Sequence, residues 1–255
     1  MISHTVVAAG FSTYQPFSFT QSIANVSISI FLTTLVISIL FIIYRVKIKK
    51  QEAHLPSSNY VICFQIYIEF IRNMVIEVLG KKFEKITPFF IYLFSYILLS
   101  NTISIFGFAN PTSSLSVTLS LGVVTFVGIF VIGIKYQKWS FLKKYTFNIN
   151  TKKKSIPVMI NPLNIIGQIT PLISLSFRLW GNIFAGTLIT TMLLVSTQNA
   201  MDSVLPFHFF NVIGVFILIP LHIYFDLLSG LIQAFVFFLL TMVYWKMETN
   251  EKDSI

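Results

Sequence analysis

The sequence is dominated by uncharged, mostly apolar runs that are each long enough to cross a lipid bilayer. The first run, Ile23 to Tyr44, has 22 residues without a charged side chain. A helix needs about 20 such residues to span a hydrocarbon core of roughly 30 Å. Charged residues make up 11% of the chain, whereas a soluble domain has about 25%. The sequence therefore predicts an all-α integral membrane protein with a single membrane domain.

Four more apolar stretches follow the first. Pro88 to Phe108 and Leu115 to Ile134 each match the length of one crossing, and a short uncharged turn joins them. Ile156 to Val195 and Pro206 to Tyr244 are longer, and each would measure about 60 Å as a helix. Each of these two is expected to be either one strongly tilted and bent span or two spans joined by a turn. The first reading gives about five transmembrane helices in all.

Residues 60–80 differ from these runs because polar side chains recur there every three to four residues. Gln65, Glu69, Glu77 and Lys81 belong to this stripe, and apolar residues fill the other positions. This pattern is typical of an amphipathic helix that lies in the membrane interface. A helix packed on its neighbours is an equally good interpretation.

The basic residues indicate how the chain is oriented in the membrane. The net charge is +9, and 17 of the 18 basic residues fall in 45–85, 135–154 and the tail. Loops rich in Lys and Arg lie on the cytoplasmic side, so we expect an external N-terminus and a cytoplasmic C-terminus. This distribution explains the charge without a nucleic-acid partner. The expected parts, in order, are an external segment, a first span, an interfacial helix, a helical hairpin, a channel helix pair and a cytoplasmic tail: 1–22, 23–44, 60–80, 88–134, 156–245 and 246–255.

One basic residue, Arg178, remains, and it lies within an apolar stretch. An arginine at the bilayer centre costs roughly 2.5 kcal/mol or more on insertion scales, so such residues are usually functional. Polar residues at helical spacing accompany Arg178 and form one stripe along the predicted helix. The members of this stripe are Thr170, Ser174, Arg178 and Asn182.

The last apolar stretch carries one deeply placed acid, Asp226. Asp226, Gly230 and Gln233 share one helix face. If the last two stretches form an antiparallel hairpin, one register places Arg178 level with Gln233 and Thr187 level with Asp226. The polar residues would then gather at two heights, separated by nine residues or about 13 Å of helix.

The two charged residues are suited to different tasks. Arginine does not lose its proton in a protein, so Arg178 provides a fixed positive charge. Asp226 can bind and release a proton, which predicts one group that relays protons and another that controls their path. A structural ion pair between Arg178 and Asp226 is the alternative. No motif for nucleotide or zinc chemistry is present, and Cys63 is the only cysteine, so neither a cofactor nor a metal is expected.

Two segments closely resemble subunit a of F-type ATP synthases, which belongs to the proton-conducting Fo sector. They read SLSFRLWGNIFAGTLI from Ser174 and LIQAFVFFLLTMVY from Leu231. The segments PFFIYLFSYILLSN and NPTSSLSVTLSLG, from Pro88 and Asn110, are similar to the preceding spans of that family. The resemblance covers about residues 60–247.

The resemblance implies a non-catalytic stator subunit that forms two proton half-channels beside a ring of c subunits. Arg178 would face the carboxylate of each c subunit, and Asn182 and Gln233 match positions near the arginine. Ser174 and Thr170 match positions that border the cytoplasmic half-channel. The implied partners are the c-ring, the b subunits of the peripheral stalk, the F1 sector and the lipid bilayer.

Three positions depart from the family pattern. Thr187 stands where many bacterial relatives have Glu, and Asp226 stands where His, Glu or a small polar residue is common. Asp226 is therefore expected to be the proton relay of the outer half-channel. The acid often found just upstream of the arginine motif is missing, and Gly167 and Gln168 lie there instead.

Other classes of function remain open at this point. A secondary transporter or anion channel could use Arg178 to bind an anionic substrate, and it would predict internal repeats, which the sequence lacks. A purely structural membrane subunit is a third interpretation. The lysine-rich loops favour a bacterial plasma membrane over a mitochondrial inner membrane.

Overall fold

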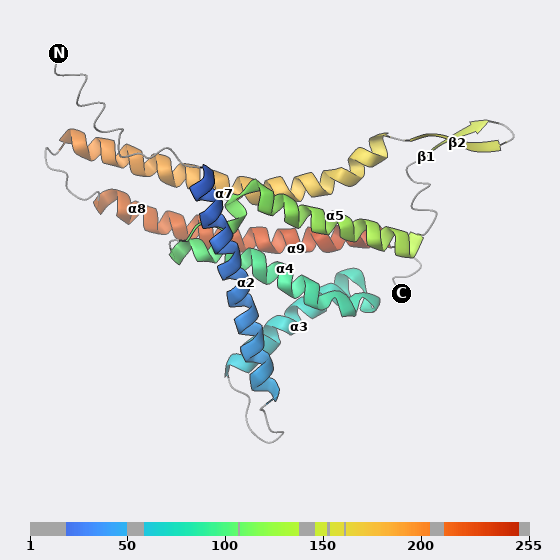
Figure 1. Cartoon of the computed structure of the whole chain (residues 1–255), viewed down its shortest axis with the longest axis horizontal. Helices are drawn as coiled ribbons and strands as arrows, with labels where there is room; N and C mark the ends of the chain where they lie inside the picture. Colours follow the sequence, from blue (N-terminus) through green and yellow to red (C-terminus); the bar gives the residue numbers. More distant parts are fainter. Residues whose placement is uncertain are drawn as a thin grey trace, which may run out of the picture.

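The computed structural model is helical apart from one short hairpin of strands (Figure 1). It describes residues 19–49, 59–106, 108–137, 146–151, 154–160, 162–204 and 212–249. The elements in order are α2 (Phe19–Lys49), α3 (Asn59–Leu79), η1 (Lys81–Ile86), α4 (Thr87–Thr102), η2 (Ile103–Phe106), η3 (Pro111–Ser113), α5 (Leu115–Gln137), β1 (Thr146–Thr151), β2 (Lys154–Ile160), α7 (Pro162–Val204), α8 (Val212–His222), η4 (Ile223–Ser229) and α9 (Gly230–Met247).

Five helical stretches are long and apolar enough to cross a membrane, which confirms the predicted class. They cover Asn25–Lys49, Lys81–Phe106, Leu115–Gln137, Ile166–Thr197 and Ile219–Met247. The predicted 60–80 helix corresponds to α3, which is not among these five. One face of α3 packs on α4 and α9, and its buried side chains are Val61, Ile71, Val75 and Leu79.

Two features of the last helices differ from those predicted from the sequence. The helix expected from Ile156 begins at Pro162, because residues 154–160 form β2 and pair with β1 in an antiparallel hairpin. β2 is apolar, so its composition alone did not separate it from the helix that follows. The last stretch is also not one regular helix, because the π-helical turn η4 lies between α8 and α9. The expected turn near Pro206, residues 1–18 and the tail after 249 lie outside the described residues.

The core of the molecule lies between α4 and α9. Phe90 of α4 is buried, and the centroid of its ring lies 5.7 Å from that of Phe238 and 5.0 Å from that of Trp245. The indole Nε1 of Trp245 donates a hydrogen bond of 3.0 Å to the carbonyl of Thr125 in α5. Gly128 permits this close approach, because a Cβ there would lie 2.2 Å from the indole ring. Aromatic packing therefore joins α4, α5 and α9 into one unit.

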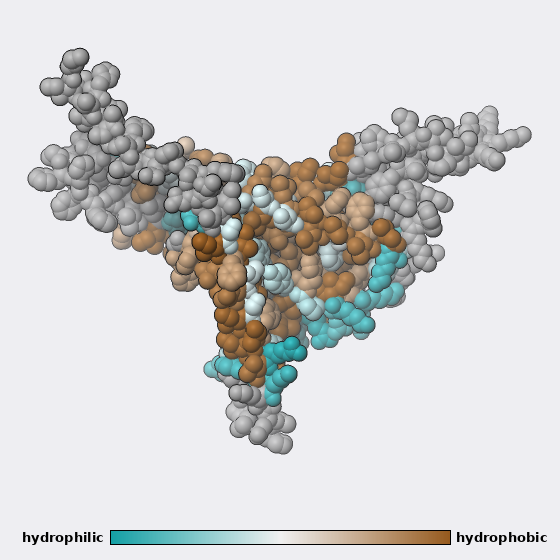
Figure 2. All heavy atoms as spheres, in the orientation of Figure 1, coloured by the Kyte–Doolittle hydropathy of each residue, from teal (hydrophilic) through white to brown (hydrophobic). Residues whose placement is uncertain are grey.

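In Figure 1, α2 crosses the direction of α7 and α9 at a steep angle. Its bundle-facing stripe consists of Ser29, Thr33 and Ile37, which are buried and four residues apart. Small side chains at such positions let membrane helices approach closely. The opposite face exposes large apolar residues, as expected for contact with lipid. Figure 2 shows hydrophilic side chains gathered over the ends of α2, α3 and α5, where the basic residues lie.

Candidate functional site

The candidate site lies between α7 and the α8–η4–α9 segment, which pack against each other. The hydroxyl of Ser229 donates a hydrogen bond of 2.8 Å to the side-chain oxygen of Asn182. One turn along α7, Gly186 faces Phe225, and a Cβ added to Gly186 would lie 3.1 Å from the Phe225 ring. Both contacts follow the antiparallel register that was predicted from the polar residues. The predicted pairing of the last two long helices is therefore confirmed.

Arg178 lies on the exposed side of α7, away from the bundle. Its neighbours Leu175 and Leu179 are each 1% exposed and face inward, whereas Arg178 itself is exposed. The predicted stripe shares its side of the helix: Thr170 is exposed, and Ser174 and Asn182 are half-buried. Among the described residues, Arg178 makes no ion pair with an acid. A positive charge on this face is therefore available to a group from another chain.

Asp226 is paired with a histidine and not with Arg178. The Oδ2 atom of Asp226 lies 3.0 Å from Nδ1 of His222, four residues earlier. The Asp226 side chain is 16% exposed and that of His222 is 52% exposed, so the pair extends from a sheltered to an open position. The alternative of an internal ion pair between Arg178 and Asp226 is therefore wrong. No role for His222 was predicted from the sequence, although its spacing from Asp226 places both on one helix face.

The backbone around Asp226 is unusual. Asp226 lies inside η4, where the helix is wider than an α-helix. A π-helical turn is rare and often occurs at functional sites. The same turn contains Phe225 and ends at Ser229, the residues that contact α7. The π turn thus positions the carboxylate and both interhelical contacts together.

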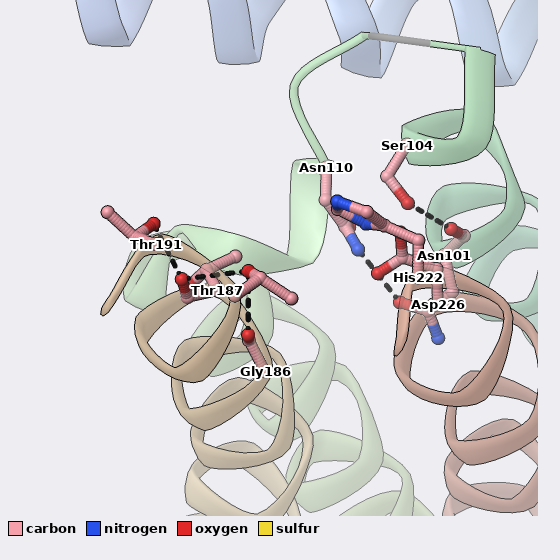
Figure 3. A network of polar contacts seen from close by, with 9 residues as sticks. Asn101, Ser104, Asn110, Gly186, Thr187, Thr191, His222 and Asp226 are labelled. Carbon is pink, nitrogen blue, oxygen red and sulfur yellow. Dashed lines mark hydrogen bonds and ion pairs between the residues drawn. The ribbon is translucent and has the colours of Figure 1, made fainter. Parts of the chain in front are cut away.

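A buried amide network lies next to this turn and was not predicted. Asn101 of α4 donates a hydrogen bond of 3.3 Å to the Gly230 carbonyl, and Asn110 donates one of 3.1 Å to the side-chain oxygen of Asn101. The Thr112 hydroxyl lies within 3.1 Å of the same oxygen. Figure 3 shows Asn101 and Asn110 on the same side as His222 and Asp226. The sequence offered one signal for this network, because polar residues stand at the end of an apolar run.

Thr187 belongs to a separate group of hydroxyls on α7. Its hydroxyl donates to the Phe184 carbonyl at 2.9 Å, and its own carbonyl accepts a hydrogen bond of 2.7 Å from the hydroxyl of Thr191. Figure 3 shows Thr187 and Thr191 on α7, apart from Asp226. No hydrogen bond joins Thr187 to Asp226 in the described part of the chain. Gln233, which the register places level with Arg178, is half-buried on α9.

The arrangement combines a fixed cation with a group that can carry protons. A carboxylate and an imidazole both bind protons, and the 3.0 Å contact between Asp226 and His222 is short enough for a proton to pass between them. Within the described residues, no cluster of His, Cys, Asp or Glu could hold a metal ion. The site is therefore suited to moving protons past a fixed positive charge.

Comparison with known proteins identifies the family. The profile of the ATP synthase A chain matches residues 27–246. ATP synthase subunit a of Mycoplasmoides gallisepticum is 41% identical, over 86% of this chain and 76% of the relative. The same subunit of Mycoplasma genitalium is 36% identical, over 94% of this chain and 83% of the relative. The chain therefore belongs to the ATP synthase A chain family, subunit a of the F-type ATP synthases.

Proposed function

We propose that Arg178 faces the carboxylates of a c-ring and that Asp226 with His222 relays protons to them from the outer side. The chain is a multi-pass membrane protein and belongs to the family of the proton-channel stator subunit. Subunit a is a non-catalytic subunit of the ATP synthase. The observation that carries the proposal is the position of Arg178. It is exposed on α7 and is not paired with an acid among the described residues.

The charge of Arg178 would act on each passing carboxylate. Two unit charges about 4 Å apart attract each other by roughly 4 kcal/mol at the effective dielectric of a protein surface. This attraction favours the ionised form, so a carboxylate that meets Arg178 gives up its proton before it passes. The same charge repels a free proton. Arg178 would thus separate two half-channels and prevent a direct leak between them.

Asp226 would supply the outer half-channel. His222 is the more exposed partner, so a proton would reach the imidazole first and then the sheltered carboxylate 3.0 Å away. Thr187 and Asn182 on α7, and Gln233 on α9, lie beside the path towards Arg178. Ser174 and Thr170 extend the Arg178 stripe in the opposite direction, towards the cytoplasmic half-channel.

The geometry also supports the expected placement in the membrane. α7 has 43 residues, which corresponds to about 65 Å and is twice the thickness of a hydrocarbon core. If α2 follows the membrane normal, α7 and α9 are strongly inclined, since α2 crosses them steeply (Figure 1). The relatives are bacterial, which favours a bacterial plasma membrane, and the placement of the basic residues favours an external N-terminus. The c-ring, the b subunits and the F1 sector are the partners.

Family membership removes the other classes of function considered from the sequence. A transporter or anion channel that binds a substrate at Arg178 is no longer needed to explain an arginine within a membrane-spanning helix. The c-ring carboxylate provides the anion instead.

The proposal is tested by ATP-driven proton pumping in inverted membrane vesicles. Arg178→Gln keeps a polar side chain that can donate hydrogen bonds but removes its charge, so we expect pumping to be lost while the complex still assembles. Arg72→Gln is the matched control, because Arg72 is an exposed arginine on α3 paired with Glu84. The control should pump normally. Wild-type pumping by Arg178→Gln would overturn the proposal.

A further inference from the structure

Three helix ends meet at one buried carboxylate, far from Asp226 along the chain. Glu248 directly follows α9 and is 4% exposed. Nε2 of Gln168 in α7 donates a hydrogen bond of 2.9 Å to its Oε1, and Nε2 of Gln137 in α5 donates one of 3.0 Å to its Oε2. The Gln137 amide also lies 3.0 Å from the Glu248 carbonyl. We call Gln137, Gln168 and Glu248 the three-helix clamp.

The end of α9, which carries Glu248, is closely packed. Trp245, three residues before Glu248, is buried and stacks on Phe89 of α4 with ring centroids 5.3 Å apart. Its indole also donates to the Thr125 carbonyl in α5. Glu248 therefore extends from the aromatic core that joins α4, α5 and α9.

α7 is more exposed than the end of α9, although it packs along α5. Only 22% of its membrane-length window is buried in the described chain, against 50% for the segment that contains α4. Pro171 lies inside α7, between Gln168 and Arg178. It has no backbone N–H to donate, and a proline inside a helix permits a kink. Two side-chain ties to the last helices lie on either side of Arg178: Asn182 to Ser229, and Gln168 to Glu248. With both ties in place, α7 cannot slide, or bend at Pro171, without breaking one of them.

We propose that the three-helix clamp fixes the height and the bend of α7, so that Arg178 stays level with the ring carboxylates while the ring turns. Glu248 is then a positioning residue for Arg178 that acts through Gln168. This inference rests on the proposed role of Arg178. It also explains why Gln168 can replace an acid upstream of the arginine motif: the carboxylate comes from the end of α9.

The two hydrogen bonds to the Glu248 carboxylate suit a positioning role. Each carboxylate oxygen of Glu248 accepts a hydrogen bond from a glutamine amide, and an amide neither gives up nor takes up a proton in this pH range. Such charge-assisted hydrogen bonds are stronger than neutral ones and specify geometry. A clamp needs this directional holding.

The test measures the ratio of protons pumped to ATP hydrolysed in vesicles, normalised to the amount of assembled complex. Glu248→Ala removes both hydrogen bonds to the carboxylate, so we expect the ratio to fall about tenfold or more, since a single hydrogen bond to a charged group is worth at least this factor. Passive proton permeability after removal of F1 should rise, because a displaced Arg178 no longer blocks the leak. A purely structural defect would lower assembly and both activities together, and would leave the ratio unchanged.

Exchange of the partners provides the sharpest variants. Gln168→Glu places two carboxylates together and should lower the ratio, whereas the double variant Gln168→Glu with Glu248→Gln restores an amide–carboxylate pair and should recover it. Glu248→Gln alone can still donate and accept, so it should stay within about twofold of the unchanged protein. The control, Glu84→Gln, removes an exposed acid from η1 and should have no effect.

Two results would overturn the clamp. One is a normal ratio in Glu248→Ala, and the other is a ratio abolished by Glu248→Gln alone, which would indicate a relay. Arg178→Gln measured in parallel separates this failure from failure of the proposed function. If Arg178→Gln does not pump while Glu248→Ala is fully coupled, only the clamp is wrong.

Discussion

Arg178 and Asp226 differ in exposure and in the side chains that they contact, and both differences follow from the helix faces on which they lie. Arg178 is exposed because it lies opposite the buried leucines of α7. Asp226 is sheltered because the π turn places it on the side of Asn101 in α4 and of Asn110, which precedes η3 (Figure 3). In the proposed mechanism, the guanidinium would meet another chain, while the carboxylate would receive protons within this one.

At the residue scale we expect Asp226→Asn to reduce ATP-driven pumping by about 100-fold, a typical contribution of one positioned proton-transfer group. The amide keeps the shape of the side chain but cannot carry a proton. His222→Gln should reduce pumping less, because water can still reach Asp226, which is partly exposed. Thr191→Val serves as the control on α7, since among the described residues its hydroxyl bonds only to a carbonyl of its own helix. Normal pumping by Asp226→Asn would remove Asp226 from the path.

At the scale of elements, the lengths of the apolar runs predicted the helices because crossing a bilayer sets a minimum length. The register of the last pair was predictable because polar side chains in a membrane must face one another or a cavity. The strand β2 was missed, since a short apolar segment has no periodicity that separates it from a helix. The π turn and the contact between Asn101 and Gly230 were also missed, because they depend on packing between segments 129 residues apart.

The contact between α4 and α9 predicts the effect of a single methyl group. A Cβ at Gly230 would lie 2.7 Å from the Cβ of Asn101, which is backbone-anchored and buried. We expect Gly230→Ala to destabilise the fold by about 1–3 kcal/mol, the usual cost of overpacking. Thermal unfolding of the purified complex measures this. Gly167→Ala is the matched control, because nothing lies within 4 Å of its added Cβ; equal stability of the two variants would contradict the packing.

At the scale of the whole molecule, a firmly packed unit of α4, α5 and α9 supports the long, mostly exposed helix α7. This division suits a stator, since one side must resist force while the other side contacts a moving ring. The large apolar side chains that α7 exposes would meet the ring or lipid. Arg178 is the charged residue within that apolar face.

The most direct test of this account is a disulfide cross-link between α7 and a c subunit. Ser174→Cys, one turn from Arg178, is combined with a cysteine beside the ring carboxylate, after Cys63 is replaced by serine. Mild oxidation should then produce a cross-linked a–c product on a non-reducing gel. Ser176→Cys is the control, because Ser176 is fully buried against Gly122 of α5 and should not cross-link. A cross-link at residue 176 but not at 174 would show that α7 presents its other face and would contradict the account.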